Sequence, residues 1–153
     1  MLLAITWADG GWAIVTGIVA TAAWTGLVVV AQRQRRRKAL DAFVGSYESY
    51  TKLNGKFLGN IDIRRDDKVL RVDFTENARG EIGGRITLSE RFPKSGHAVY
   101  EHRLPDDRLA WGTWDVQLAD SGKTIFVTTR YVDDVDPVEV VQGSEWRRIG
   151  RTR

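Results

Sequence analysis

The sequence predicts an all-β fold, a small antiparallel up-and-down barrel of about eight strands, preceded by one N-terminal transmembrane helix. Two observations support this prediction. Residues 10–32 contain no charged side chain, and a basic run follows them. Beyond residue 43, apolar and polar residues alternate with a period of two, and turn residues interrupt them at short intervals. A chain of 153 residues then has room for one β-domain beside the membrane segment.

Residues 11–32 form the predicted transmembrane helix, with residues 1–10 as a short extracytoplasmic N-terminus. At about 1.5 Å per residue, a helix of this length crosses a hydrocarbon layer about 30 Å thick. Trp7 and Trp12 stand near its start, where indole rings favour the headgroup level. A cleaved signal peptide is the alternative. A signal peptide carries positive charge before its apolar run, whereas the only charged side chain in residues 1–10 is the acidic Asp9.

A basic cluster follows the predicted span and begins a helical extension over residues 33–42. Its members are Arg33, Arg35, Arg36, Arg37 and Lys38. Basic residues next to a membrane helix are retained on the cytoplasmic side. The sequence therefore predicts a single-pass protein of the inner (plasma) membrane, with its N-terminus outside and its β-domain in the cytoplasm. The lipid bilayer is the first predicted partner. Each basic side chain also attracts anionic lipid by about 1 kcal/mol, although a stop-transfer signal without lipid specificity is the simpler explanation.

Small residues recur every four positions along one face of the predicted span. They are Ala13, Gly17, Thr21 and Thr25. Such a face lets two helices approach closely, so a homo-oligomer through these residues is a further prediction. The whole segment is rich in small residues, and chance produces the same spacing easily.

Charge and cysteine content narrow the classes of function. The net charge of +3 comes from basic residues at the two ends of the domain, whereas residues 43–146 carry more acidic than basic side chains. Nucleic-acid binding needs a basic face on the fold and is therefore not expected. The chain has no cysteine, which excludes disulfides and thiolate zinc sites.

The β-domain is expected over residues 43–150, followed by a basic tail at 151–153. Short turns separate eight segments with strand patterns: residues 45–52, 55–64, 69–76, 80–92, 97–104, 109–118, 123–132 and 138–149. No connection has room for a crossover helix, so neighbouring strands are expected to be antiparallel. With about eight strands, a sheet closes around an interior that is filled by side chains or holds one small ligand. Closure also removes exposed strand edges.

Period-two spacing selects the residues that face the barrel interior. The predicted set is Ile61, Ile63, Leu70, Val72, Phe74, Ile82, Ile86 and Leu88. Phe57 has the same parity as Ile61 and Ile63 and is expected on the same face.

Four aromatic or polar residues form a candidate ligand site inside the predicted barrel: Tyr47, Tyr100, His102 and Trp114. Aromatic faces and polar tips in an apolar interior suit a small planar ligand such as a nucleotide. Core residues satisfied by their neighbours explain the same pattern. Trp114 is preferred over Trp111 as the inward tryptophan because its face of the strand is more apolar. Arg130 completes the candidate site as a phosphate ligand, but both faces of its strand are equally apolar, so its parity stays open.

No motif supports catalysis. His97 and His102 are the only histidines, and their spacing places them on opposite faces of one strand, where they cannot share a metal. No grouping of Ser, His and an acid follows from spacing. The sequence therefore predicts no enzyme, no metal and no cofactor.

The start of the β-domain carries a family resemblance. Residues Phe43, Val44, Gly45, Ser46 and Tyr47 open the first strand much as the Gly-x-Trp motif opens a lipocalin-like (calycin) barrel, with Tyr47 in place of the tryptophan. The resemblance implies that Arg147 or Arg148, on the last strand, covers this aromatic ring. The layout also resembles the transmembrane β-barrel effectors of bacterial CBASS antiphage signalling. In that family a compact barrel binds a nucleotide signal and membrane helices respond, usually two helices where this chain has one.

The sequence thus predicts a single-pass, membrane-anchored cytoplasmic β-barrel. Its expected function is to recognise a small molecule, for example a nucleotide signal, and to couple binding to the membrane helix. The alternative is a structural or docking subunit of a membrane complex, with a filled barrel and no ligand. Ligand binding predicts polar groups around a cavity, whereas docking predicts a filled barrel and an exposed apolar patch.

Overall fold

A computed structural model describes the backbone of residues 7–76, 80–104, 107–132 and 139–150. Side chains are described from residue 24 onwards within these ranges, except that of residue 76. The chain divides into two compact units, Met1–Arg37 and Lys38–Arg153.

The first element is helix α1 (Trp7–Phe43), which contains the predicted extension at residues 33–42. Among the residues with described side chains, no helix is both long and apolar enough to cross a membrane. Residues 11–23 of the predicted span lie outside that set, as do three members of the predicted packing face, Ala13, Gly17 and Thr21.

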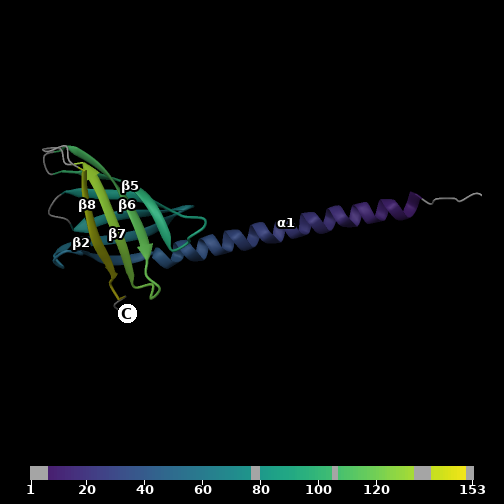
Figure 1. Cartoon of the computed structure of the whole chain (residues 1–153), viewed down its shortest axis with the longest axis horizontal. Coiled ribbons are helices and arrows are strands. Elements are labelled where there is room, and N and C mark those ends of the chain that lie inside the picture. The colour runs from purple at the N-terminus through teal and green to yellow at the C-terminus, as the bar shows by residue number, and fades with distance from the viewer. Residues whose placement is uncertain (1–6, 77–79, 105–106, 133–138, 151–153) are drawn as a thin grey trace, which may run out of the picture. The chain divides into compact units, whose positions relative to one another are not determined.

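Eight antiparallel strands follow the helix and close into a barrel in chain order, with the last strand paired to the first (Figure 1). The strands are β1 (Gly45–Thr51), β2 (Phe57–Asp66), β3 (Val69–Glu76), β4 (Glu81–Leu88), β5 (Ser95–Arg103), β6 (Leu109–Leu118), β7 (Thr124–Val132) and β8 (Glu139–Arg148). Two of the tight connections contain a residue with positive φ, Asp67 at +50° and Gly122 at +68°. Asp and Gly are the residue types that tolerate this conformation. The predicted all-β barrel is therefore confirmed.

The interior follows the predicted alternation. Six of the eight predicted residues are buried: Ile61, Ile63, Leu70, Val72, Ile86 and Leu88. The other two, Phe74 and Ile82, are partly buried and pack against the same core. Inward parity was therefore correct for all eight.

The expectation that Phe57 lies on the same face as Ile61 and Ile63 was wrong. Its side chain is 46% exposed and lies on the outside, with its ring centroid 5.7 Å from that of Tyr50. The register of β1 and β2 shifts here, because Ser49 pairs with Gly59 while Tyr50 pairs with Phe57. The extra residue, Leu58, forms a bulge, and one extra residue turns the following side chain to the other face.

One end of the barrel is closed by the last residues of α1, which belong to the same unit as the strands. Leu40 and Phe43 are buried in the core. The Tyr47 hydroxyl donates to the Phe43 carbonyl oxygen at 2.8 Å and accepts from Arg148 Nε at 3.1 Å. On the outside, Asp41 pairs with Arg65 at 2.8 Å. Hydrogen bonds and apolar burial thus fix the helix end to both strands that complete the barrel.

The alternation predicts opposite outcomes for two adjacent residues of β3. Val72→Asp is expected to unfold the barrel, because it buries an unpaired charge at a position with no solvent exposure. Asp73→Ala removes only a partly exposed ion pair with Arg71, and we expect a loss of at most about 1 kcal/mol. Denaturant titration followed by circular dichroism measures both. Equal tolerance of the two changes would contradict the register described above.

Candidate functional site

An aromatic cluster lies in the interior of the barrel. Tyr100 of β5 stacks on Trp114 of β6, with ring centroids 4.5 Å apart and planes at 12°. Trp146 of β8 meets Trp114 edge-on at 5.4 Å, and Phe74 of β3 lies 6.0 Å from Trp114. Trp114 is 3% exposed, whereas Trp111 is 58% exposed, so the predicted choice between the two tryptophans is confirmed.

Two glycines make room for this stack. A Cβ added to Gly112 would lie 2.4 Å from the Tyr100 hydroxyl oxygen, and one added to Gly84 would lie 2.8 Å from the Trp114 ring. The Tyr100 ring therefore lies close against the backbone of β6, and the Trp114 ring close against that of β4. Glycine within a strand often marks such a close approach.

Tyr100 carries a hydroxyl into this apolar interior. Burial, with a smaller contribution from Tyr131, raises the pKa of Tyr100 to about 12. The hydroxyl therefore stays neutral at physiological pH. His102 follows two residues later on β5, half-buried, in register with Ile82 and Ala110. The structure thus brings three predicted site residues to neighbouring inward positions: Tyr100, His102 and Trp114.

Tyr47 and Arg130 have different surroundings. The Tyr47 hydroxyl is engaged by Phe43 and Arg148, and the Arg148 guanidinium lies 5.2 Å from its ring centroid. An arginine therefore covers this ring, and Tyr47 belongs to the closure of the barrel end. Arg130 is a correction to the candidate interior site, because it lies on the outer face 3.8 Å from Asp115. Its neighbours Ile125 and Val127 are the buried set of β7, which decides the parity that the sequence left open.

Two serines are buried among the apolar side chains, and no sequence pattern singles them out. Ser49 of β1 pairs in register with Trp146, and its hydroxyl has no hydrogen-bond partner within the described residues. Ser144 of β8 pairs with Thr51 and is likewise buried. An unsatisfied buried hydroxyl is uncommon, so Ser49 marks a position where a polar ligand atom would gain a hydrogen bond.

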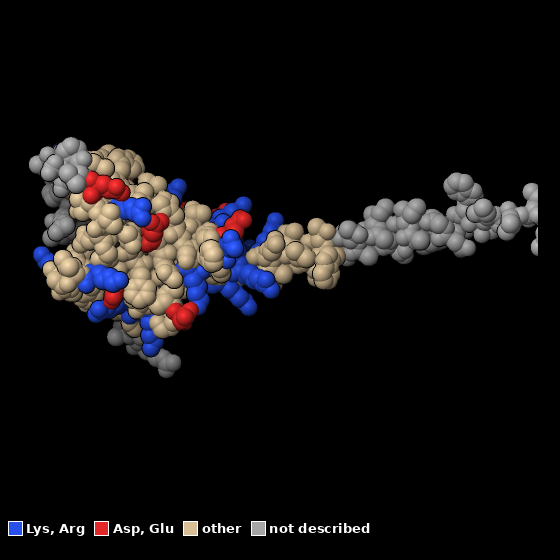
Figure 2. All heavy atoms as spheres, in the orientation of Figure 1, with Lys and Arg blue, Asp and Glu red and all other residues tan. Residues whose placement is uncertain are grey.

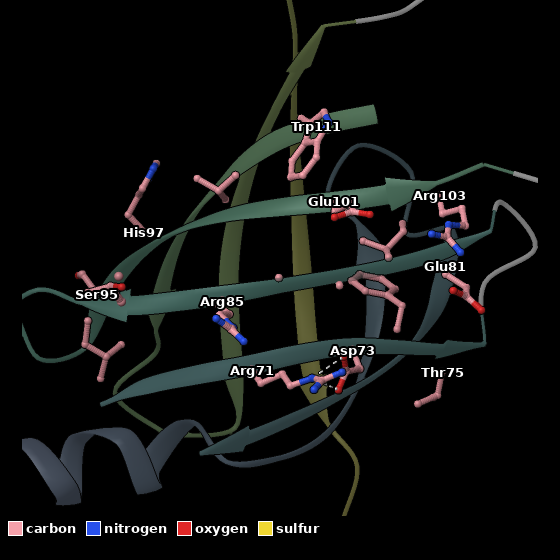
Figure 3. A pocket seen from close by; sticks show the side chains of 18 of the residues that line it. Arg71, Asp73, Thr75, Glu81, Arg85, Ser95, His97, Glu101, Arg103 and Trp111 are labelled. Atoms are coloured by element: carbon pink, nitrogen blue, oxygen red, sulfur yellow. Dashed lines mark hydrogen bonds and ion pairs between the residues drawn. The ribbon is translucent and has the colours of Figure 1, made fainter. Parts of the chain in front are cut away.

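The outer face of the barrel carries a hollow of about 1390 Å³ over β3, β4, β5 and β6, called the outer hollow below (Figure 3). Its polar and aromatic lining includes Arg71, Asp73, Thr75, Glu81, Arg85, Ser95, His97, Glu101, Arg103 and Trp111. Sequence reasoning missed this feature, because each of these residues has the ordinary outward parity of a solvated strand face.

Two arginines of the outer hollow stand directly opposite each other. Arg71 of β3 pairs in register with Arg85 of β4, and Figure 3 shows both side chains on the same open side. Arg71 Nε donates to both carboxylate oxygens of Asp73, each at 3.1 Å. Arg85 makes no hydrogen bond or ion pair with any described residue. Like charges opposite each other destabilise a sheet, so an anionic group beside Arg85 would relieve repulsion.

Among the described residues, no group of three or more His, Asp or Glu side chains is placed to hold a metal ion. His97 lies on the outer face with its Nδ1 2.8 Å from Asp115 Oδ1, whereas His102 has inward parity on the same strand. The two histidines are therefore apart, as their spacing predicts.

The fold and the two features above define a small closed β-barrel with an aromatic cluster in its interior and a hollow on its outer face. No family model, curated protein or solved structure matches the chain. The resemblances to lipocalin-like barrels and to CBASS effectors therefore stay expectations.

The fit of the aromatic stack can be tested at a glycine. Gly112→Ala is expected to destabilise the protein by about 1 to 3 kcal/mol, because its methyl group overlaps the Tyr100 ring and forces it off Trp114. Near-ultraviolet circular dichroism and thermal unfolding measure the loss. Gly143→Ala is the matched control, since its Cβ would meet only Lys52 at 3.5 Å. Equal melting temperatures for the two variants would contradict the described packing.

Proposed function

We propose that the chain is a membrane-tethered docking module: a filled β-barrel, held at the cytoplasmic face of the membrane by α1, that binds a partner on its outer surface. This is the docking function that the sequence leaves open as the alternative to ligand recognition. The observation that favours it is the contrast between the two sides of the barrel wall. Trp114 is enclosed by aromatic neighbours on the inside, whereas the outer hollow is open.

Exposed apolar side chains on the outer face support a docking role. Val99 and Trp111, both in the outer hollow, are 57% and 58% exposed. Val141 is a further exposed apolar residue on the same cross-strand row as Val99, separated from it by Thr113 and Arg130. Figure 2 shows basic and acidic side chains interspersed with uncharged surface on the visible face of the barrel. Tryptophan and arginine together are typical of the residues that dominate binding energy in protein interfaces.

The tether is supported by the described part of α1 within residues 24–37. Large apolar side chains are exposed at five positions: Trp24, Leu27, Val28, Val29 and Val30. At 100° per residue these positions point all round the helix, a distribution suited to a lipid environment and costly in water.

The exposed basic side chains that follow support the orientation of the tether. They are Arg33, Arg35, Arg37 and Lys38. The positive-inside rule assigns the side of the membrane that carries such residues to the cytoplasm, and the barrel follows them in the chain.

One cross-linking experiment tests tether and docking together. A photo-reactive amino acid replaces Trp111 in the full-length protein, and cells are irradiated before membranes are washed at alkaline pH. We expect the protein to stay in the membrane pellet and to give a discrete adduct, because position 111 lies at the docking surface. The same residue in place of Lys123, in the turn between β6 and β7, is the matched control and should give none.

Deletion of residues 1–32 completes this experiment, since it removes the uncharged segment and should release the barrel into the supernatant. Recovery of the full-length protein in the alkaline supernatant would contradict the tether. A pellet protein with no adduct specific to position 111 would contradict docking.

A small-molecule function inside the barrel is the second candidate, and the unpartnered Ser49 hydroxyl favours it. Such a ligand would form a hydrogen bond with this hydroxyl. Coupling of its binding to the membrane helix would then follow the function expected from the sequence.

Thermal-shift titration with cyclic oligonucleotides and lipophilic metabolites tests the second candidate. We expect at least one compound to raise the melting temperature of the wild type. Ser49→Ala should reduce that shift without lowering the melting temperature of the free protein, because it removes an unsatisfied group. If no compound shifts the wild-type melting temperature, the second candidate is wrong.

A further inference from the structure

The barrel end that α1 closes is rich in basic side chains. Because the strands alternate in direction, five segments meet there: residues 38–43, 65–68, 89–94, 119–123 and 147–150. Contacts join them, since Lys94 pairs with Asp120 at 2.7 Å and the Arg148 N–H donates to the Lys123 carbonyl oxygen at 2.8 Å. The five segments, called the basic end below, carry eight basic and five acidic side chains, although residues 43–146 are acidic overall.

An exposed aromatic side chain stands among these charges. Phe92, in the connection between β4 and β5, is 59% exposed, and the Arg91 guanidinium lies 5.5 Å from its ring centroid. Hydrogen bonds fix the backbone of this connection. The Phe92 N–H donates to Ser89 Oγ at 3.2 Å, and the Phe92 carbonyl oxygen accepts from the Ser95 N–H at 2.8 Å. The backbone thus holds the Phe92 ring outside the core.

The cations of the basic end can meet an external anion. Lys38 and Lys68 are exposed and make no ion pair with another described residue. Lys94 is paired with Asp120, but their side chains are 56% and 99% exposed, and such surface pairs contribute little to stability. A phosphate group can therefore take the place of the carboxylate.

The chain brings the basic end close to the proposed tether. Helix α1 continues without a break to Phe43, and Lys38 follows the last residue of the predicted span, Gln32, by six residues. At about 1.5 Å per residue, this is about 9 Å along the helix. Electrostatic attraction in physiological salt acts over a similar distance, about 8 to 10 Å. Anionic headgroups at the end of the span therefore attract this end of the barrel more than the opposite end.

We propose that the basic end rests on the headgroups of an anionic lipid bilayer, with Phe92 in the interfacial layer and the surrounding basic side chains on lipid phosphates. This inference rests on the proposed tether and goes beyond it, because a tether alone leaves the orientation of the barrel open. Aromatic rings favour the headgroup level, and basic side chains are attracted to anionic lipid. An exposed ring among lysines and arginines combines both properties on one surface.

A fluorescent label near each end of the barrel tests this inference. The chain has no cysteine, so a single introduced cysteine is the only site that a thiol-reactive label modifies. Ser121→Cys places the label at the basic end and keeps Phe92 intact. Leu53→Cys is the matched control, because Leu53 is 95% exposed in the connection between β1 and β2, at the other end.

The full-length protein is reconstituted into vesicles that contain a lipid with a quencher on its headgroup. We expect phosphatidylserine in the vesicles to increase quenching of the label at position 121 over that in phosphatidylcholine alone, and added salt to reverse the increase. The label at position 53 should stay unquenched in both. Equal quenching at the two positions would overturn the inference.

Two pairs of charge reversals separate a local contact from the effect of total charge. Lys68→Glu with Arg91→Glu, in the protein labelled at position 121, should weaken the contact by about tenfold. Lys52→Glu with Lys56→Glu makes the same change of charge at the other end and should leave the quenching unchanged. If both pairs reduce the quenching equally, no specific surface faces the lipid and the inference is wrong.

The tether and the lipid contact fail in different ways. Release of the full-length protein from the vesicles at alkaline pH would contradict the tether and, with it, this inference. Protein that stays in the vesicles while phosphatidylserine leaves the label at position 121 unchanged would overturn the lipid contact alone. The tether and the docking function would then stand, and an acidic protein would be the partner of the basic end.

Discussion

The stack of Tyr100 on Trp114 is the constraint on which the rest of the barrel depends. An eight-stranded barrel has an interior about wide enough to be filled by side chains. Two large rings fit across it only because Gly84 and Gly112 leave the strand backbone bare beneath them. Trp146 and Phe74 then occupy the space at the edges of the stack. Aromatic rings thus occupy the interior at this level, whereas the outer hollow lies on the other side of the wall.

The barrel itself could be predicted from the sequence, because alternation and turn residues are local signals. The irregularities in the register of paired strands could not be predicted in this way. Phe57 faces outward because a bulge at Leu58 inverts the parity that holds from Gly59 onwards. Arg130 lies on a strand whose two faces are equally apolar, so only the buried neighbours Ile125 and Val127 reveal its side. The register of β2 and β3 is likewise interrupted by a bulge at Thr75, which no local sequence pattern marks.

At the barrel end that α1 closes, only part of the packing could be predicted from the sequence. The covering of Tyr47 by an arginine was expected from a family resemblance, and Arg148 occupies this position. The burial of Leu40 and Phe43 was not expected, since two apolar residues one turn apart look like any helical linker. Only the closed barrel supplies the apolar surface that they cover. Of the candidate site, the inward parity of Tyr100 and Trp114 was predictable, but their contact with each other was not.

Phe74 of the aromatic cluster is accessible from both sides of the barrel wall. Its ring lies 6.0 Å from Trp114 and 6.1 Å from Trp146, and its side chain also lines the outer hollow. Protein interiors are packed too densely for one ring to move alone. Phe74 therefore cannot move far without moving Trp114 or Trp146 as well, and Trp114 is confined by the backbone of Gly84. The outer hollow thus reaches the packing of the core through Phe74, and also through Ile82 and Leu88, which line it as well.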